Sequence, residues 1–332
     1  MEYRNLGRSG VSVSAIAMGC WGIGGDWTWG AQDQEATNAT VHEALDLGVN
    51  LFDNAEGYAD GGSETALGIA LKGRRHEAVI ATKASDTHLA PPDIFAACEG
   101  SLRRLQTDYI DLYQLHWPSR AVSLAETLGA LDELKREGKV REVGVCNFGV
   151  GDLADLLALE PAAPAVTDQL PYGLLWRAVE DAILPRCRTA GLGILAYTPL
   201  AQGLLTGKFR TADEVPEGRA RTRHFAGNRP KSRHGEPGAE AEAFEAIDQI
   251  RGISERAGLS MTRVALAWVL AQPGVSSVLV GARRPEQIRE NAKAAAVRLD
   301  ADLVRQLTDA TAALKAKLGP NPDEYQSVSR FR

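Results

Sequence analysis

Short apolar runs alternate with stretches of helical periodicity between residues 15 and 295 of this chain. This alternation is typical of parallel β-strands joined by crossover helices. The apolar runs predict eight strands, at residues 15–18, 49–52, 78–82, 110–115, 140–145, 165–169, 193–197 and 276–280. Eight parallel strands are the number that closes a barrel, so we expect an α/β fold of the (β/α)8 TIM-barrel class.

Amphipathic stretches predict a helix after each strand, at residues 33–47, 63–72, 91–106, 123–137, 150–158, 178–190, 261–271 and 285–295. Pro91 and Pro285 stand at helix starts, where a missing N–H costs nothing, and Gly138 stands where a helix should end. Residues 1–14 alternate around a turn at 7–10, which predicts an N-terminal β-hairpin at the bottom of the barrel.

Residues 206–238 interrupt this rhythm, because they contain eight Lys or Arg residues and three prolines but little apolar periodicity. Long insertions in compact domains are usually functional lids or disordered segments. A lid-like insertion and a solvated surface excursion both fit the pattern. Further helices are expected at 239–257 and 300–316, as additions to a single barrel domain over residues 1–332.

Composition and charge argue against several classes of protein. The 332 residues carry 37 Lys and Arg against 43 Asp and Glu, a formal charge of −6, which argues against a nucleic-acid binder. No apolar run is long enough for a membrane span, and the first residues lack a signal segment, so we expect a cytoplasmic protein. The four cysteines are widely spaced, which predicts neither a disulfide framework nor a metal site. A homo-oligomer remains open.

Polar residues stand at the ends of the predicted strands. In a barrel of this class the chemistry lies at the C-terminal ends of the strands. Each such residue alone has a structural explanation, as a cap, a packed side chain or a solvent contact. Titratable groups from consecutive strands would nevertheless converge at one mouth, which predicts a functional site. The strand-end residues are Asp53, Lys83, His116, Asn147, Gln169, Tyr197 and Gly281.

Several motifs follow one another along nearly the whole chain. They are DNAEGY at 53–58, GSE at 62–64, ATK at 81–83, DYIDLYQLHWP at 108–118, GVCNF at 144–148, YTPL at 197–200, GLLTG at 203–207 and GARRPEQ at 281–287. With these motifs the chain resembles the aldo-keto reductase superfamily, and most of all the bacterial enzymes of its potassium-channel β-subunit-like branch. The resemblance implies a (β/α)8 barrel that uses a nicotinamide cofactor, usually NADPH, to reduce aldehydes and ketones without a metal.

The resemblance assigns the catalytic roles to Asp53, Tyr58, Lys83 and His116. Reduction of a carbonyl requires a hydride at carbon and a proton at oxygen, and the cofactor supplies the hydride. Tyr58 is then the proton donor, provided that Lys83 lowers the phenol pKa, which is ordinarily about 10. Asp53 would keep the Lys83 ammonium charged and aimed, and His116 would donate a hydrogen bond to the carbonyl oxygen. The same groups would serve the reverse reaction.

No Rossmann glycine fingerprint marks the cofactor site. The run GLGILA at 191–196 enters a strand, whereas the fingerprint requires a strand, a turn and then a helix. A phosphate site is expected instead at 281–291, where a strand end leads into a helix N-terminus. Arg283 would fork onto a 2′-phosphate there, which favours NADPH (NADP+) over NADH.

The resemblance also implies further cofactor contacts. Asn147 and Gln169 would hold the nicotinamide carboxamide, and Tyr197 would stack on its ring. Two positions depart from the family pattern: Cys146 stands where Ser is usual and is a poorer hydrogen-bond partner, and Asn54 stands where Thr is usual. The full set of expected cofactor residues is Trp21, Asn147, Gln169, Tyr197, Pro199, Leu200, Gly203, Lys208, Gly281, Arg283, Gln287, Glu290 and Asn291.

The partner expected at the barrel mouth is a small-molecule carbonyl substrate. Apolar walls would come from Trp21, Trp27, Trp29 and Trp117, although tryptophans in barrel loops also serve as packing. Basic residues of the 206–238 segment would favour polar or anionic carbonyl compounds if they face the mouth. The candidates are Arg221, Arg223, His224 and Arg229.

Two alternative functions remain open at this point. One is a cofactor-binding regulatory module, because channel β-subunits share this barrel and keep the cofactor. The other is a Schiff-base lyase, because Lys83 ends a barrel strand as the lysines of such enzymes do. NADPH affinity without turnover would support the first function, and borohydride trapping of a substrate on Lys83 would support the second.

Overall fold

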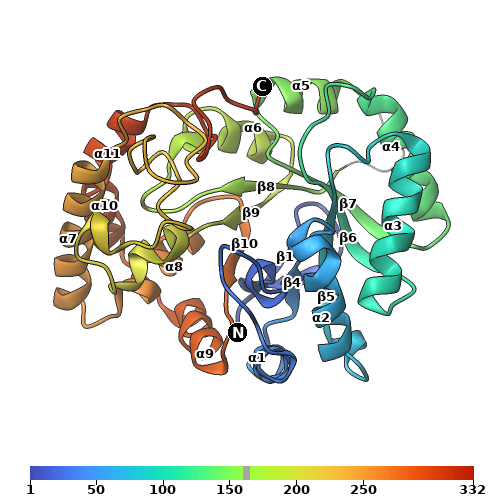
Figure 1. Ribbon diagram of the computed structural model, residues 1–332, viewed down its shortest axis with the longest axis horizontal. Helices are drawn as coiled ribbons and strands as arrows, with labels where there is room; N and C mark the ends of the chain where they lie inside the picture. Colours follow the sequence, from blue (N-terminus) through green and yellow to red (C-terminus); the bar gives the residue numbers. More distant parts are fainter. Residues whose placement is uncertain (160–164) are drawn as a thin grey trace.

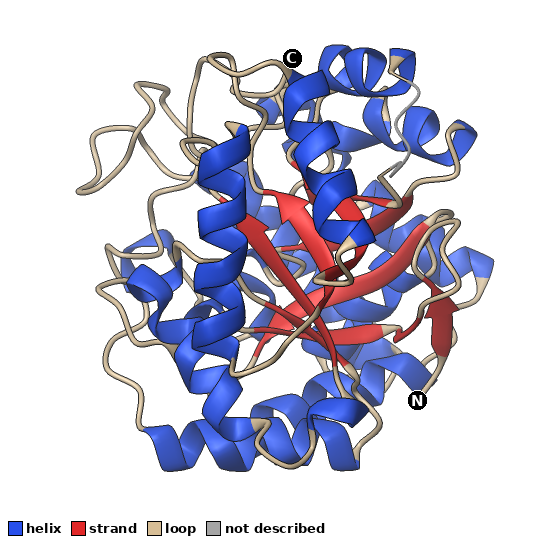
Figure 2. Cartoon of the chain, turned by 90° about the vertical axis from the view of Figure 1, so that its right-hand side faces the viewer, coloured by secondary structure: helices blue, strands red, loops and turns tan. Residues whose placement is uncertain are grey.

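The computed structural model describes residues 1–159 and 165–332, and it shows a closed barrel of eight parallel strands surrounded by helices (Figure 1, Figure 2). The strands are β3 (Ile16–Gly19), β4 (Leu51–Asp53), β5 (Val79–Ala84), β6 (Ile110–Leu115), β7 (Val140–Cys146), β8 (Thr167–Pro171), β9 (Gly193–Tyr197) and β10 (Val275–Gly281). They pair in sequence order, and β10 pairs with β3 to close the ring. The (β/α)8 fold predicted from the apolar runs is confirmed.

An N-terminal hairpin of β1 (Tyr3–Asn5) and β2 (Ser12–Ser14) closes the N-terminal end of the barrel. Its Leu6 and Val13 are fully buried and pack with residues of the barrel strands. Gly7 has a φ of 55°, and a Cβ added to it would lie 1.9 Å from the carbonyl oxygen of Val166. This close approach requires glycine. The predicted hairpin is therefore confirmed, and it acts as a plug.

The predicted crossover helices surround the strands. They are α1 (Gln34–Asp46), α2 (Gly62–Ala70), α3 (Pro91–Leu105), α4 (Leu124–Arg136), α5 (Val150–Ala158), α6 (Ile183–Thr189), α8 (Met261–Leu270) and α9 (Pro285–Lys293), with α7 (Glu240–Arg256) added before α8. Asp33 and Ser260 cap α1 and α8 by accepting backbone N–H hydrogen bonds. Short 3-10 turns are η1 (Trp21–Ile23), η2 (Tyr58–Gly61), η3 (Arg75–Glu77), η4 (Ala178–Glu180), η5 (Ala201–Thr206), η6 (Ala212–Glu214) and η7 (Ala294–Ala296). No helix within the described ranges is both long and apolar enough to span a membrane.

Two short helices, α10 (Ala301–Asp309) and α11 (Ala312–Leu318), take the place of the single helix predicted at 300–316. The chain turns at Thr311, whose hydroxyl oxygen accepts a hydrogen bond from Nη1 of Arg177 at 3.0 Å. The same nitrogen donates to the carbonyl of Thr308, 2.8 Å away at the end of α10. The prediction of one continuous helix is wrong, because a side chain from another part of the chain satisfies the carbonyl that a continued helix would use.

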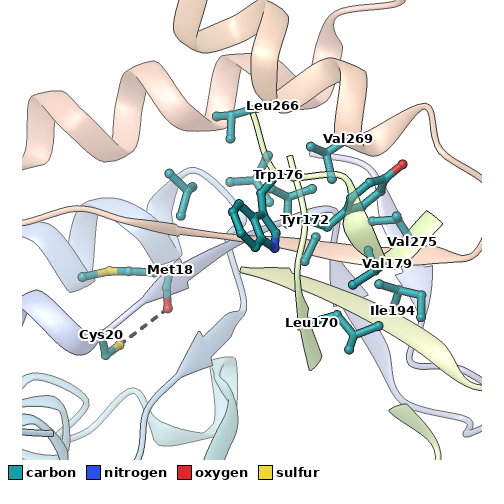
Figure 3. Close-up of a cluster of buried hydrophobic side chains, with 14 of the residues drawn as sticks. Met18, Cys20, Leu170, Tyr172, Trp176, Val179, Ile194, Leu266, Val269 and Val275 are labelled. Carbon is teal, nitrogen blue, oxygen red and sulfur yellow. Dashed lines mark hydrogen bonds between the residues drawn. The ribbon is translucent and has the colours of Figure 1, made fainter. Parts of the chain in front are cut away.

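Large buried side chains join the barrel to the helices at its rim (Figure 3). The rings of Tyr172 and Trp268 lie 5.6 Å apart. The indole N–H of Trp268 donates to Thr308 Oγ1 at 3.0 Å, and that of Trp176 donates to the carbonyl of Pro322 at 3.1 Å. Buried indoles with satisfied N–H groups give apolar contact and orientation together. This cluster therefore ties α10 and the chain that follows α11 to the strands.

The C-terminal tail, residues 319–332, runs from α11 to the N-terminus of α5 (Figure 1). The carbonyl of Arg332 accepts hydrogen bonds from the backbone N–H groups of Gly151 and Asp152, at 2.5 and 3.2 Å. These N–H groups belong to the first turn of α5 and have no partner inside the helix. The tail thus caps α5 from outside, a contact that the sequence did not predict.

The segment 206–238 packs against this tail. Residues 220–225 are buried within it, although the segment contains only short turns as regular structure. Arg223 donates to the carbonyl groups of Leu318 and Asn321, at 2.9 and 3.1 Å. The segment and the tail therefore hold each other, and whether they act as a lid stays a prediction.

Candidate active site

Three predicted residues meet at the C-terminal ends of β4 and β5. Nζ of Lys83 lies 2.9 Å from Oδ2 of Asp53 and 3.2 Å from the hydroxyl of Tyr58. The ammonium also donates to the carbonyl of Asn54 at 2.6 Å. The Lys83 side chain is fully buried and Asp53 nearly so. The three N–H groups of the ammonium thus donate to a carboxylate, a carbonyl and a phenol, which fixes the orientation of the Lys83 side chain.

Tyr58 and His116 reach this ion pair from two different loops. Tyr58 begins η2, where its N–H donates to the carbonyl of Ala55, and its ring stacks on Trp21 with centroids 6.0 Å apart. His116 directly follows β6, and its ring meets Tyr58 edge to face at 5.9 Å. The structure therefore brings together all four residues that the resemblance assigned to catalysis.

Burial and charge set the protonation states at this site. Burial disfavours the charged form of Lys83, but the Asp53 carboxylate, with Tyr58, outweighs it and raises the pKa of Lys83 above its ordinary value. Burial raises the pKa of Tyr58 to about 12, although the charge of Lys83 acts in the opposite direction. Burial, then the positive charges of Lys83 and Arg330, lower the pKa of His116 to about 3, so its imidazole is neutral. Lys83 acts on the phenol in the predicted sense, but burial is the larger effect.

Two further residues position the ion pair, and the sequence did not assign them that task. Gln169 Nε2 donates to Oδ1 of Asp53 at 2.7 Å, so this amide holds the carboxylate from the side away from Lys83. Glu64, in the GSE motif, is fully buried, accepts from Thr82 Oγ1 at 2.5 Å and pairs with Arg104 at 2.7 Å. Thr82 precedes Lys83 on β5, so this pair fixes the strand that carries the ammonium.

The residues expected around the nicotinamide form a connected network. The Tyr197 hydroxyl donates to Oδ1 of Asn147 at 2.7 Å, and Nδ2 of Asn147 donates to the carbonyl of His116 at 2.9 Å. Cys146 lies against this network, with its Sγ 3.1 Å from Nδ2 of Asn147. Burial raises the pKa of the Cys146 thiol well above its ordinary value. Nδ2 of Asn54 is buried without a hydrogen-bond partner in the described chain.

A group of uncompensated positive charges lies beside the expected phosphate loops. Burial and the charge of Arg219 lower the pKa of Lys208, and burial and the charge of Arg283 lower the pKa of Arg219. None of the three forms an ion pair with a residue that the structure describes. Gly203, in η5 with a φ of 100°, brings its Cα close to Lys208, because an added Cβ would lie 3.0 Å from Nζ. Clustered cations without carboxylates fit the phosphates of a dinucleotide.

Arg283 has a more restricted position than predicted. Its Nε donates to Gln32 at 2.8 Å, and its terminal nitrogens donate to the carbonyls of Trp29, Gly30 and Ala31. The guanidinium therefore clamps the loop after β3 onto the loop after β10. Its role at a 2′-phosphate stays a prediction.

Three more of the expected cofactor residues, Gln287, Glu290 and Asn291, lie on α9. Gln287 accepts a hydrogen bond from the backbone N–H of Arg283 at 2.8 Å, and Asn291 donates to the carbonyl of Gly281 at 3.3 Å. Glu290 pairs with Arg263 at 2.7 Å. Pro199 and Leu200 follow β9, immediately before η5.

Aromatic side chains surround the mouth next to Tyr58. Trp21 meets Trp29 edge to face at 5.6 Å, and Trp27 is 57% exposed. Trp117 packs against Phe331, with centroids 5.4 Å apart, and carries the Arg330 guanidinium 3.7 Å from its ring centre. Sequence reasoning missed the tail residues at the mouth, because residues 319–332 carry no motif or periodicity that would have found them.

The four basic candidates of the 206–238 segment differ in position. Arg223 is bound by the tail and by Glu236, and His224 is buried against the carbonyl of Leu175. Arg229 pairs with Glu240 and Asp213. Only the Arg221 guanidinium contacts the aromatic mouth, where it lies 5.6 Å from the ring centre of Trp21.

Comparison with known proteins places this geometry in a family. A family model described as "Aldo/keto reductase family" matches residues 15–312. The chain is 34% identical over 331 residues to "NADH-specific methylglyoxal reductase" of Escherichia coli (strain K12), covering 92% of this chain and 98% of that protein. It is 32% identical over 310 residues to "Probable voltage-gated potassium channel subunit beta" of Oryza sativa subsp. japonica, covering 89% and 91% of the two chains.

Solved structures agree with the sequence comparisons. The crystal structure of an aldo-keto reductase from Klebsiella pneumoniae in complex with NADPH superposes with a TM-score of 0.74 and 29% identity, over 93% of this chain and 95% of that chain. The family model extends from the first barrel strand into the helices after the last one. The family predicted from the motifs is confirmed, and the channel-subunit relative is consistent with the predicted branch. This chain belongs to the aldo/keto reductase family.

Proposed function

We propose that this protein reduces aldehydes or ketones to alcohols with NADPH, reversibly, and that Tyr58 is the proton donor. The observation that carries the proposal is the buried ion pair of Lys83 and Asp53 within hydrogen-bond distance of the Tyr58 hydroxyl. Relatives support the reaction class, because one is named a methylglyoxal reductase and one solved neighbour holds NADPH. The bound nicotinamide would supply the hydride.

The protein's own groups would handle the substrate oxygen. Neutral His116 can donate a ring N–H to the carbonyl oxygen and orient it. Tyr58 then gives its proton to that oxygen as negative charge develops on it. The phenolate that remains is stabilised by the ammonium of Lys83, and Asp53, held by Gln169, keeps that ammonium in place. Proton donor, cation and carboxylate thus form one chain of hydrogen bonds.

The residues that would hold the cofactor fit its chemistry. Asn147 and Gln169 present amides beside the reacting groups, and the turn of η5 with Lys208 and Arg219 offers cations to phosphates. The uncompensated charge of this group favours NADPH, which carries one phosphate more than NADH. NADH is the less favoured alternative, supported by the name of the Escherichia coli relative.

The reaction is tested by following NADPH and NADH at 340 nm with methylglyoxal, glyceraldehyde, nitrobenzaldehyde and several sugars. We expect oxidation with at least one aldehyde and a KM about tenfold lower for NADPH than for NADH, since one additional charge-assisted phosphate contact is worth roughly that ratio. NADPH binding without turnover across the panel would favour a regulatory subunit instead, as the rice relative's name suggests.

Arg219→Met is expected to raise the KM for NADPH about tenfold with little change in kcat, because Arg219 would contact the cofactor and not the reacting carbonyl. Initial rates at varied NADPH check this. Arg229→Met is the matched control, since it removes an arginine of the same segment that is already paired with Glu240. Equal changes in the two variants would mean that the effect comes from the segment's fold and not from a phosphate contact.

A lyase mechanism through Lys83 is disfavoured by the ion pair itself. A Schiff base requires a neutral amine, whereas Asp53 raises the pKa of Lys83 despite burial. Borohydride should therefore trap no substrate on Lys83.

A further inference from the structure

Arg221 carries a guanidinium held by three aromatic rings. The residue is only 6% exposed, and its Nε donates to the carbonyl of Gly218 at 3.1 Å. The guanidinium carbon lies 5.6 Å from the ring centre of Trp21, 5.1 Å from that of Trp27 and 4.9 Å from that of Tyr325. Cation–π contacts of this kind fix a guanidinium without using its N–H groups.

The two terminal nitrogens of Arg221 are free of partners in the described part of the chain. No ion pair or side-chain hydrogen bond of these nitrogens is present there, whereas Arg223 and Arg229 on the same segment are both paired with carboxylates. A buried arginine usually spends its fork on a carboxylate or on carbonyl groups. At Arg221 the aromatic rings fix the guanidinium in place, but its two terminal nitrogens have no hydrogen-bond acceptor among the described residues.

The position of this fork is next to the reacting groups. Trp21, which contacts Arg221, also stacks on Tyr58. Tyr325, which also contacts Arg221, comes from the C-terminal tail. Arg221 therefore shares the aromatic neighbour Trp21 with the proposed proton donor.

Glu324 of the tail does not neutralise the charge of Arg221. Glu324 accepts a hydrogen bond from Thr198 Oγ1 at 3.0 Å and forms no ion pair with Arg221. Burial raises the pKa of Glu324 to about 8, although Thr198 and Arg221 oppose this, so the group is mostly protonated at neutral pH. The positive charge of Arg221 thus remains available to a ligand.

We propose that Arg221 is an anion subsite, and that the preferred substrates are short aldehydes or ketones that carry a carboxylate. This inference rests on the proposed function, because it places the substrate carbonyl at Tyr58. A planar carboxylate matches the two parallel N–H donors of a guanidinium fork. The aromatic walls suit the short aliphatic chain between the two ends of such a substrate, and a single cation suits a single negative charge.

The test compares 4-oxobutanoate with its methyl ester, which keeps the aldehyde and removes the charge. We expect the wild type to show a kcat/KM about thirtyfold higher for the acid than for the ester with NADPH. Arg221→Gln should lower this acid-to-ester ratio about thirtyfold, since hydrogen bonds between charged groups are worth about that factor. Lys231→Gln is the control. The Nζ of Lys231 lies 4.2 Å from the ring centre of Trp27, so this substitution also removes one positive charge close to the mouth. It should change the ratio by less than about twofold.

An unchanged ratio in Arg221→Gln, or an equal fall in Lys231→Gln, would overturn the subsite while leaving carbonyl reduction intact. If neither of these two aldehydes is reduced, the proposed function is judged on the panel described above, and binding decides the subsite. Calorimetry with butanoate and butanamide then serves as the second measurement. Butanoate should bind the wild type more tightly than butanamide and lose that advantage in Arg221→Gln. Equal binding of the two compounds to the wild type would reject the subsite.

Discussion

Replacement of Tyr58 by phenylalanine is expected to lower kcat for carbonyl reduction by about a thousandfold, because general acid catalysis contributes roughly this factor. The phenyl ring can still stack on Trp21, so the shape of the mouth is retained. Stopped-flow or steady-state rates at 340 nm measure the loss, and quenching of tryptophan fluorescence by NADPH measures whether cofactor binding persists. Near-wild-type rates would rule out Tyr58 as the proton donor.

Tyr113→Phe is the matched control for this variant. Tyr113 lies on β6 of the same barrel, is fully buried, and its hydroxyl has no hydrogen-bond partner among the described residues. Removal of this hydroxyl should leave kcat within about twofold of the wild type and change stability little, since no hydrogen bond is lost. A large loss in Tyr113→Phe as well would mean that loss of a buried phenol hydroxyl perturbs the barrel in general.

Replacement of Lys83 by methionine is expected to lower both the rate and the stability. The variant removes the cation that we propose stabilises the phenolate, so kcat should fall by about a thousandfold. It also leaves Asp53 buried without its ion-pair partner, which should lower the free energy of unfolding by about 3 kcal/mol. Rates at 340 nm and denaturant unfolding measured by circular dichroism check the two effects.

A double variant separates these two effects. Asp53→Asn combined with Lys83→Met removes both charges, so most of the lost stability should return while the activity stays lost. A double variant as unstable as the sum of the single variants would show that the two residues are not coupled. Recovery of activity in the double variant would contradict the role of Lys83 in stabilising the phenolate.

The barrel could be predicted because parallel strands covered by helices are buried on both faces. Their residues therefore form continuous apolar runs, as in β9 (GILAY), where the first four of its five residues are buried. Helix starts were predictable at Pro91 and Pro285, where proline fits the first turn. The break between α10 and α11 was not predictable, because Arg177, more than 100 residues away in sequence, makes the contacts at that turn.

The site was predictable to the extent that strand ends define it. Asp53 and Lys83 end neighbouring strands, so parallel topology alone brings them together. The hydrogen-bond partner of each amide side chain was not predictable. Nε2 of Gln169 donates to Asp53 because the two side chains meet across the barrel. The tail residues Tyr325 and Arg330 were missed for a related reason. Arg330 lies over the ring of Trp117 at the mouth. The tail is held there by hydrogen bonds to its backbone, such as the one from Arg223 to the carbonyl of Asn321, and contacts of this kind leave no pattern in the sequence.

Burial of the cysteines has a consequence for the proposed reduction of carbonyl compounds, which are electrophiles. Reactive carbonyl compounds modify proteins by reaction with thiolates, and a thiol that keeps its proton is a poor nucleophile. Cys20 and Cys146 contact the candidate site residues Asp53 and Asn147, yet burial raises the pKa of both thiols, and Cys98 and Cys187 are buried as well. Attack of these thiols on a carbonyl compound is thereby suppressed at the candidate site, where the substrate would bind. The barrel that positions Tyr58, the proposed proton donor, would also protect the protein from covalent inactivation by its own substrates.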